Sequence, residues 1–144
     1  MKIGKYFTLE ELTANKAGLV NYPDTLAMRN LTSLVKNVLD PLREMYGKPI
    51  TVNSGYRNIY VNKNVGGAPS SQHLKGEASD IDTKADNAEL FKLIRENFVF
   101  DQLIWEGGDD KAPAWIHVSF KTQGNRNEVL KMKYLHGQKA YVRL

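Results

Sequence analysis

The run Ser71-Gln72-His73-Leu74-Lys75-Gly76-Glu77-Ala78-Ser79-Asp80 places a histidine in a loop and an aspartate in the strand predicted to follow it. A second histidine lies in Ala114-Trp115-Ile116-His117-Val118-Ser119-Phe120, where residues alternate as in a half-buried strand. Two imidazoles and one carboxylate are the protein ligands of a catalytic zinc whose fourth position is left to water. These stretches therefore predict that a loop and two strands meet at one metal ion.

Side-chain alternation explains how the three residues can meet. It puts Trp115 and His117 on one face of their strand and turns the intervening apolar residues toward the core. Asp80 lies on a predicted strand over residues 78–83, and His73 comes from the loop before it. Gly76 is small and lets the chain turn tightly, so both side chains can reach one ion.

Composition restricts the class of protein. A chain of 144 residues with 42% hydrophobic residues can bury one core, so we expect a single domain over 1–144. Because there is no cysteine, any metal must be held by histidine, aspartate or glutamate. No signal peptide or run of transmembrane length is found, which predicts synthesis in the cytoplasm and no membrane insertion. We also expect a monomer.

Residues 121–144 form a basic C-terminal strand or tail, with six basic residues against one acidic residue. Such a tail can meet an anionic polymer such as nucleic acid or cell wall. The favoured interpretation is a solvated edge strand kept soluble by lysine. No interleaving of aromatic and basic residues supports nucleic acid, so we expect none as a partner. His136 is interpreted as a surface residue.

Local patterns predict helices first and strands later, an order typical of an α+β fold. A capping box of Thr8 and Glu11 opens a short helix to about Lys16. Pro41 should kink or interrupt the longer helix that follows Asp24. The other expected elements are a strand at 49–53, a helical turn at 58–64, a strand at 78–83, a helix at 87–98, and strands at 100–106 and 115–120 that pair antiparallel around a turn at 107–110.

Five positions of the first stretch match the pattern Ser-x-His-x-x-Gly-x-Ala-x-Asp: Ser71, His73, Gly76, Ala78 and Asp80. In this the chain resembles the zinc D-alanyl-D-alanine carboxypeptidases and their L-alanyl-D-glutamate and phage endolysin relatives. Further stretches are similar to the short single-domain branch of this superfamily. They are Tyr6 to Leu12, Ser54-Gly55-Tyr56-Arg57, Val65 to Ala68, Trp115-Ile116-His117 and Asn125-Arg126.

The resemblance implies the α+β fold of the Hedgehog signalling domain, with helices packed on a small antiparallel sheet and a zinc cleft over it. It implies that Zn²⁺ is bound by His73, Asp80 and His117, and that a zinc-activated water attacks the peptide. Arg57 corresponds to the family's substrate-binding arginine and is assigned to catalysis and substrate binding. Its alternative is a structural ion pair with a nearby acid.

Substrate contacts are also assigned to Ser71 and Trp115. Ser71 and Gln72 can instead simply shape the loop. Aromatic residues that can line a groove, or belong to the core and rim, are Tyr56, Tyr60 and Trp105.

The general base is the one part of the family pattern that this chain changes. Better-known members often carry an acid three residues before the third ligand, and Ala114 stands there. Glu106 is the leading substitute, with an ordinary solvent-facing carboxylate as its alternative. Asp109 and Asp110 fit a turn better. Asp82 can orient a histidine or can be a solvated strand residue.

The function expected is hydrolysis of amide bonds in peptidoglycan stem peptides, of the D-Ala-D-Ala carboxypeptidase or L-Ala-D-Glu endopeptidase type. One alternative is a non-catalytic, zinc-containing module that binds cell wall. The other is a structural protein of a virion that docks through its basic tail. An enzyme without a signal peptide would reach the bacterial cell wall as a phage lysin or as part of a virion.

Overall fold

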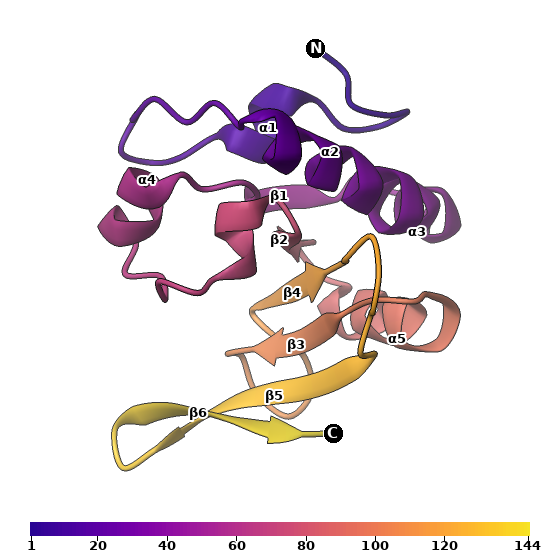
Figure 1. Ribbon diagram of the computed structural model, residues 1–144. Helices are drawn as coiled ribbons and strands as arrows, with labels where there is room; N and C mark the ends of the chain where they lie inside the picture. The colour runs from indigo at the N-terminus through magenta and orange to yellow at the C-terminus, as the bar shows by residue number, and fades with distance from the viewer.

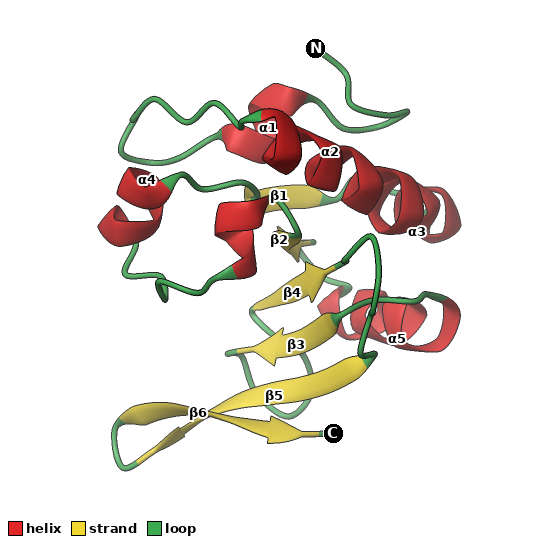
Figure 2. Ribbon diagram, viewed as in Figure 1, coloured by secondary structure: helices red, strands yellow, loops and turns green.

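The structure, a computed structural model, describes residues 1–144 and has its helices mainly in the first half of the chain (Figure 1). Its centre is a six-stranded sheet in the order β1-β2-β4-β3-β5-β6 (Figure 2). The expected α+β class is confirmed. In that spatial order the strands are Thr51–Ser54, Ala78–Asp82, Trp115–Ser119, Gln102–Glu106, Glu128–Leu135 and Gln138–Arg143.

The sheet is mixed where a small antiparallel sheet was expected, because β3 and β5 run parallel. The other neighbouring pairs are antiparallel. The reason lies in the connection after β4, which reverses the chain and carries it past β3 to that strand's free edge. Since β4 is antiparallel to β3, a strand antiparallel to β4 must be parallel to β3.

The first helix, α1 (Leu9–Thr13), begins at the capping box predicted from sequence. The Glu11 amide donates to the Thr8 hydroxyl at 3.1 Å, and the Thr8 amide donates to the Glu11 carboxylate at 3.2 Å. The helix ends at Thr13, three residues before the expected end. Beyond it, the Asn15 side chain donates to the Leu19 carbonyl and accepts from the Leu19 amide. These hydrogen bonds stabilise a loop where another helical turn was expected.

The longer helix is interrupted, as Pro41 predicted, by a π-helical turn. It comprises α2 (Thr25–Leu34), η1 (Val35–Leu39) and α3 (Asp40–Tyr46). A proline lacks an amide donor and clashes with the carbonyl one turn earlier, so widening the preceding turn keeps the helix continuous. Its apolar stripe is fully buried. No helix of the protein is both long and apolar enough to cross a membrane.

The two faces of the sheet have different uses. Helix α5 (Asn87–Asn97) covers one face, where its Phe91 ring meets the edge of Trp105 on β3. Leu103 and Ile116 on that face are fully buried in the same core as α2 and α3. The opposite face carries the residues that alternate with these, and it faces α4 (Ile59–Asn64) and η2 (Gln72–Lys75). This second face is free to form a site.

The basic C-terminal segment folds back onto the sheet as the hairpin of β5 and β6 (residues 128–143). Strand β6 is a solvated edge strand, as expected. Strand β5 departs from that expectation because β3 and β6 flank it. His136 is an exposed residue of the hairpin turn, with φ of 52°.

Candidate metal centre

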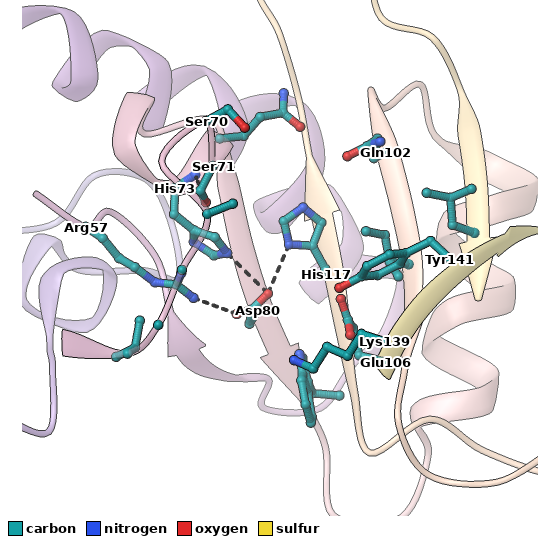
Figure 3. Close-up of a pocket in the computed structure, with 18 of the residues that line it drawn as sticks. Arg57, Ser70, Ser71, His73, Asp80, Gln102, Glu106, His117, Lys139 and Tyr141 are labelled. Atoms are coloured by element: carbon teal, nitrogen blue, oxygen red, sulfur yellow. Dashed lines mark hydrogen bonds and ion pairs between the residues drawn. The ribbon is translucent and has the colours of Figure 1, made fainter. Parts of the chain in front are cut away.

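His73, Asp80 and His117 come together on the open face of the sheet (Figure 3). Asp80 on β2 lies directly opposite His117 on β4 in the strand register. His73 reaches them from η2. Asp80 Oδ1 lies 3.4 Å from Nε2 of His73 and 3.1 Å from Nδ1 of His117. Each residue offers a ligand atom, and the three atoms lie within 4.8 Å of one another.

This spacing fits a tetrahedral zinc ion. Zinc bonds of about 2.0–2.1 Å at tetrahedral angles place neighbouring ligand atoms about 3.3–3.4 Å apart. The two distances from Asp80 are close to that value. Two nitrogens and a carboxylate oxygen also form the ligand set of a catalytic zinc with an open position. The residues present therefore fit the predicted metal.

The orientation of His73 is determined by its neighbours. Its Nδ1 lies 2.7 Å from the Gly55 carbonyl oxygen, so Nδ1 carries the proton and Nε2 is free to bind metal. The His73 carbonyl accepts from the Arg57 amide at 3.0 Å. The Ser71 hydroxyl accepts from the His73 amide at 3.2 Å. The ring is thus held before any metal binds.

Gly55 is the residue of this centre that sequence reasoning missed. A backbone carbonyl has no signal of its own in a sequence, although the glycine stood in a quoted motif. A Cβ at this position would lie 2.4 Å from the Leu12 carbonyl oxygen, so the close approach of α1 requires glycine.

The charges at the centre favour the forms that bind metal. Burial opposes ionisation of Asp80, but the adjacent rings of His117 and His73 outweigh it and hold the pKa of Asp80 well below its usual value. Burial lowers the pKa of His73, which keeps its imidazole neutral. A carboxylate and a neutral imidazole are the protonation states of zinc ligands.

Arg57 lies beside His73, Asp80 and His117, which we call the triad. It fits both interpretations made from sequence, a structural ion pair and a substrate-binding arginine. Its Nη2 is 3.3 Å from Asp80 Oδ2, which is the structural ion pair. Its Nε donates to the Ser54 hydroxyl at 2.9 Å and its Nη1 to Asn62 Oδ1 at 3.2 Å. A guanidinium has five N–H groups, so donors remain for a ligand in the cleft that Arg57 lines.

Glu106 ends β3 opposite Trp115 on β4, and both side chains line the cleft. Glu106 is 7% exposed, so it is not the solvated carboxylate of the alternative interpretation. Burial raises the pKa of Glu106 above its usual value; the nearby His117 opposes this and the Asp80 charge adds to it. Ala114, where the family often has an acid, supplies no carboxylate.

The cleft is a cavity of about 720 Å³ that contains every residue predicted for the site. One wall is the loop before η2, including Ser71, together with Gln72 at the start of η2. The Gln72 amide also donates to Asp101 at 3.0 Å, so it shapes the loop as the alternative held. The remaining lining residues are Val65, Gly66, Gly67, Ala68, Ser70, Gln102, Ile104, Arg126, Leu130, Lys139 and Tyr141.

Three acids that sequence reasoning considered lie elsewhere. Asp82 accepts from the Asn87 amide at 2.7 Å, so it anchors the start of α5 and orients no histidine. Asp109 accepts from two backbone amides of its own turn. Asp110 lies near Lys131. The turn interpretation of Asp109 and Asp110 is the one the structure supports.

The three aromatic residues considered for the groove belong to the core and rim, since none of them lines the cleft. Tyr56 is buried in the core. Tyr60 is exposed on α4. Trp105 packs on α5, on the far face of the sheet from the cleft.

Arg126 stood in a family-like stretch of the sequence, but no part of the far wall of the cleft was assigned to the site from sequence. Leu130, Lys139 and Tyr141 come from the hairpin of β5 and β6, and Arg126 comes from the loop before it. Lys139 and Tyr141 alternate on β6, which is the only available sequence signal. That signal does not say which strand β5 will join.

An open cleft that holds two imidazoles and a carboxylate is the arrangement of ligands that mononuclear zinc hydrolases use. The sequence model of the peptidase M15 family matches residues 5–119, and the chain belongs to that family. The predicted resemblance to zinc peptidases of the D-alanyl-D-alanine carboxypeptidase superfamily is confirmed, and zinc is the metal that the family and the ligand set imply.

A zinc D-Ala-D-Ala carboxypeptidase from Streptomyces albus G is 36% identical over 70 residues. The matched segment covers 48% of this chain and 28% of that protein. The chain therefore corresponds to less than a third of that relative. The hairpin of β5 and β6 lies beyond the residues that the family model matches.

Proposed function

We propose that this protein is a zinc-dependent peptidase that hydrolyses amide bonds in peptidoglycan stem peptides. The observation that carries the proposal is the convergence of His73, Asp80 and His117 in an open cleft, with Asp80 Oδ1 3.4 Å and 3.1 Å from a ring nitrogen of each histidine. The proposed substrate follows from the carboxypeptidase relative, whose name specifies a D-Ala-D-Ala bond.

The three ligands would hold zinc, and zinc when bound lowers the pKa of a coordinated water to about 7 and polarises a carbonyl. The Gly55 carbonyl keeps the His73 ring turned toward the ion. Arg57 neutralises part of the Asp80 charge and keeps free N–H donors for a carboxylate or for the oxygen of the scissile carbonyl.

Glu106 is proposed as the general base. It would accept the proton of the attacking water as the new C–O bond forms, and deliver that proton to the leaving nitrogen as the C–N bond breaks. A buried carboxylate with a raised pKa suits both steps. It is a stronger base toward the attacking water than an ordinary carboxylate, and its protonated form persists closer to neutral pH, where it can protonate the leaving nitrogen. Trp115, opposite Glu106 in the strand register, and Ser71, beside His73, line the cleft and would contact the peptide.

The test is zinc content together with release of new amino groups from purified peptidoglycan. We expect about one zinc per chain in the wild type, and loss of both zinc and turnover in His73→Ala. Glu106→Gln should keep zinc and lower kcat by about 10²–10⁴-fold. Asp110→Asn, at an exposed acid far from the triad, is the matched control and should leave both unchanged.

A non-catalytic zinc module that binds cell wall is the second candidate, and the observation in its favour is Ala114 in place of the expected acid. Full zinc occupancy without amine release would support it. Retention of full turnover in Glu106→Gln would leave the enzyme intact and reject Glu106 as its base.

The finer assignments rest on this function. We infer one peptidase domain over residues 1–144, because β5 and β6 join the sheet that carries the ligands. We propose action at the bacterial cell wall as a phage lysin or a virion-associated enzyme. A virion structural role without turnover would appear as binding to virion components that survives His73→Ala.

A further inference from the structure

Three cations line the cleft, and two of them are already paired. Arg57 contacts Asp80 at 3.3 Å, and Arg126 contacts Asp101 at 2.7 Å. Lys139 on β6 forms no ion pair. It is therefore the one cation of the cleft whose charge has no acidic partner in the protein.

Lys139 stands across the triad from Arg57. Figure 3 shows its side chain extending from β6 into the cleft, beside Glu106. No ion pair joins its ammonium to the Glu106 carboxylate. The Tyr141 side chain, two residues along the same strand face, forms the wall next to it.

The charges of the cleft favour an anion at this position. Arg57 is matched by Asp80 and Arg126 by Asp101, and Glu106 is the other carboxylate of the lining, so a bound divalent ion would make the cleft positive. A concave wall concentrates the field of the charges that line it, so an unpaired ammonium there attracts a carboxylate more strongly than one on an open surface.

We propose that Lys139 forms an anion subsite that binds a carboxylate of the substrate on the β6 side of the scissile amide. The inference rests on the proposed function, because stem peptides supply the carboxylate. The proposed subsite would make the hairpin of β5 and β6 select substrates that carry this carboxylate. That hairpin lies outside the residues matched to the family.

The test uses stem peptides in which each carboxylate is converted singly to a carboxamide. For the wild type, one conversion should raise KM about tenfold and leave kcat nearly unchanged, as expected for loss of a charge-assisted hydrogen bond. Lys139→Met should bring the KM for the unmodified peptide up to the value that the wild type shows for the carboxamide peptide. In this variant, converting the same carboxylate to a carboxamide should have no further effect on KM. Lys139→Arg should restore the preference, and the preference should weaken at high salt.

Lys133→Met is the matched control, because Lys133 is an exposed lysine of the same hairpin that does not line the cleft. It should leave every KM unchanged. A carboxylate preference that survives in Lys139→Met overturns the subsite. Equal effects of the two substitutions also overturn it, because they would reflect the general charge of the hairpin.

Binding of the same peptides to the zinc-loaded protein, measured by calorimetry, separates this proposal from the proposed function. If the wild type binds but does not turn over, the proposed function fails. The subsite is then supported by an affinity that falls about tenfold in Lys139→Met only for the peptide with the carboxylate. Equal affinities of the two proteins for that peptide overturn it.

Discussion

The two ends of the cleft are built in different ways. At the β2–β4 end, each metal-ligand candidate is buried or nearly so and is held by hydrogen bonds, as His73 is by Gly55. At the hairpin end, Lys139 and Tyr141 are exposed, and Lys139 has no ion-pair partner. The comparison teaches that the chemistry is held rigidly from one side, while the other side is free to contact a ligand.

The largest effect should come from the rigid end. His117→Ala removes one of three ligands, so we expect zinc to be lost and turnover to fall to background. His136→Ala is the matched control at the exposed hairpin turn and should keep both. Elemental analysis and amine release measure the outcome. Zinc retained at full occupancy in His117→Ala would contradict the assigned ligand set.

A second change tests Gly55, the residue whose carbonyl holds the His73 ring at the rigid end. In Gly55→Ala the new Cβ would lie 2.4 Å from the Leu12 carbonyl oxygen, and one segment must move. We expect a loss of about 1–3 kcal/mol in the free energy of unfolding. Zinc affinity should also fall, because the same residue orients His73. Denaturant unfolding and chelator competition measure these quantities, and unchanged values in both would show that the contact is not tight.

A third change tests the link between the two ends. Asp101 is fully buried and accepts from Arg126 Nη2 at 2.7 Å and from Gln72 at 3.0 Å. Asp101→Asn should cost about 1–2 kcal/mol, since Arg126 is half exposed and can be hydrated in its place. Denaturant unfolding at neutral pH measures the loss.

The same carboxylate predicts a pH dependence. The hydrogen bond from Arg126 lowers the pKa of Asp101, so its contribution to stability is present above its unfolded pKa of about 3.9. That contribution is lost as the pH falls through the lower folded value. The wild type should therefore lose more stability than Asp101→Asn between about pH 5 and pH 2. Parallel unfolding curves over that window would contradict this assignment.

The smallest effect is expected at the edge of the hairpin. Arg143 lies 3.3 Å from Glu128, and its side chain is 82% exposed. Exposed ion pairs contribute about 0–1 kcal/mol. Arg143→Ala should therefore lower the free energy of unfolding by less than about 1 kcal/mol and leave zinc content unchanged. A large loss of stability would show that the hairpin is a structural support like the metal-binding end.

Much of the fold was predictable because local chemistry specifies it. The capping box of Thr8 and Glu11 starts α1 as expected, and Pro41 interrupts the long helix. Helix α5 ends within one residue of the prediction. Strand alternation correctly placed His117 away from the core. The bounds that differ, such as the end of α1, depend on side chains that bond the following loop.

The sequence by itself predicted the three candidate ligands and determined the α+β class and the resemblance to zinc peptidases, because these depend on residue types at short spacings. Only the tertiary structure decided that β5 joins β3 in parallel and that Lys139 faces the cleft. It also decided that Glu106 is buried and that Asp82 anchors α5. These features depend on which distant strands become neighbours, and alternation along one strand does not specify its partner.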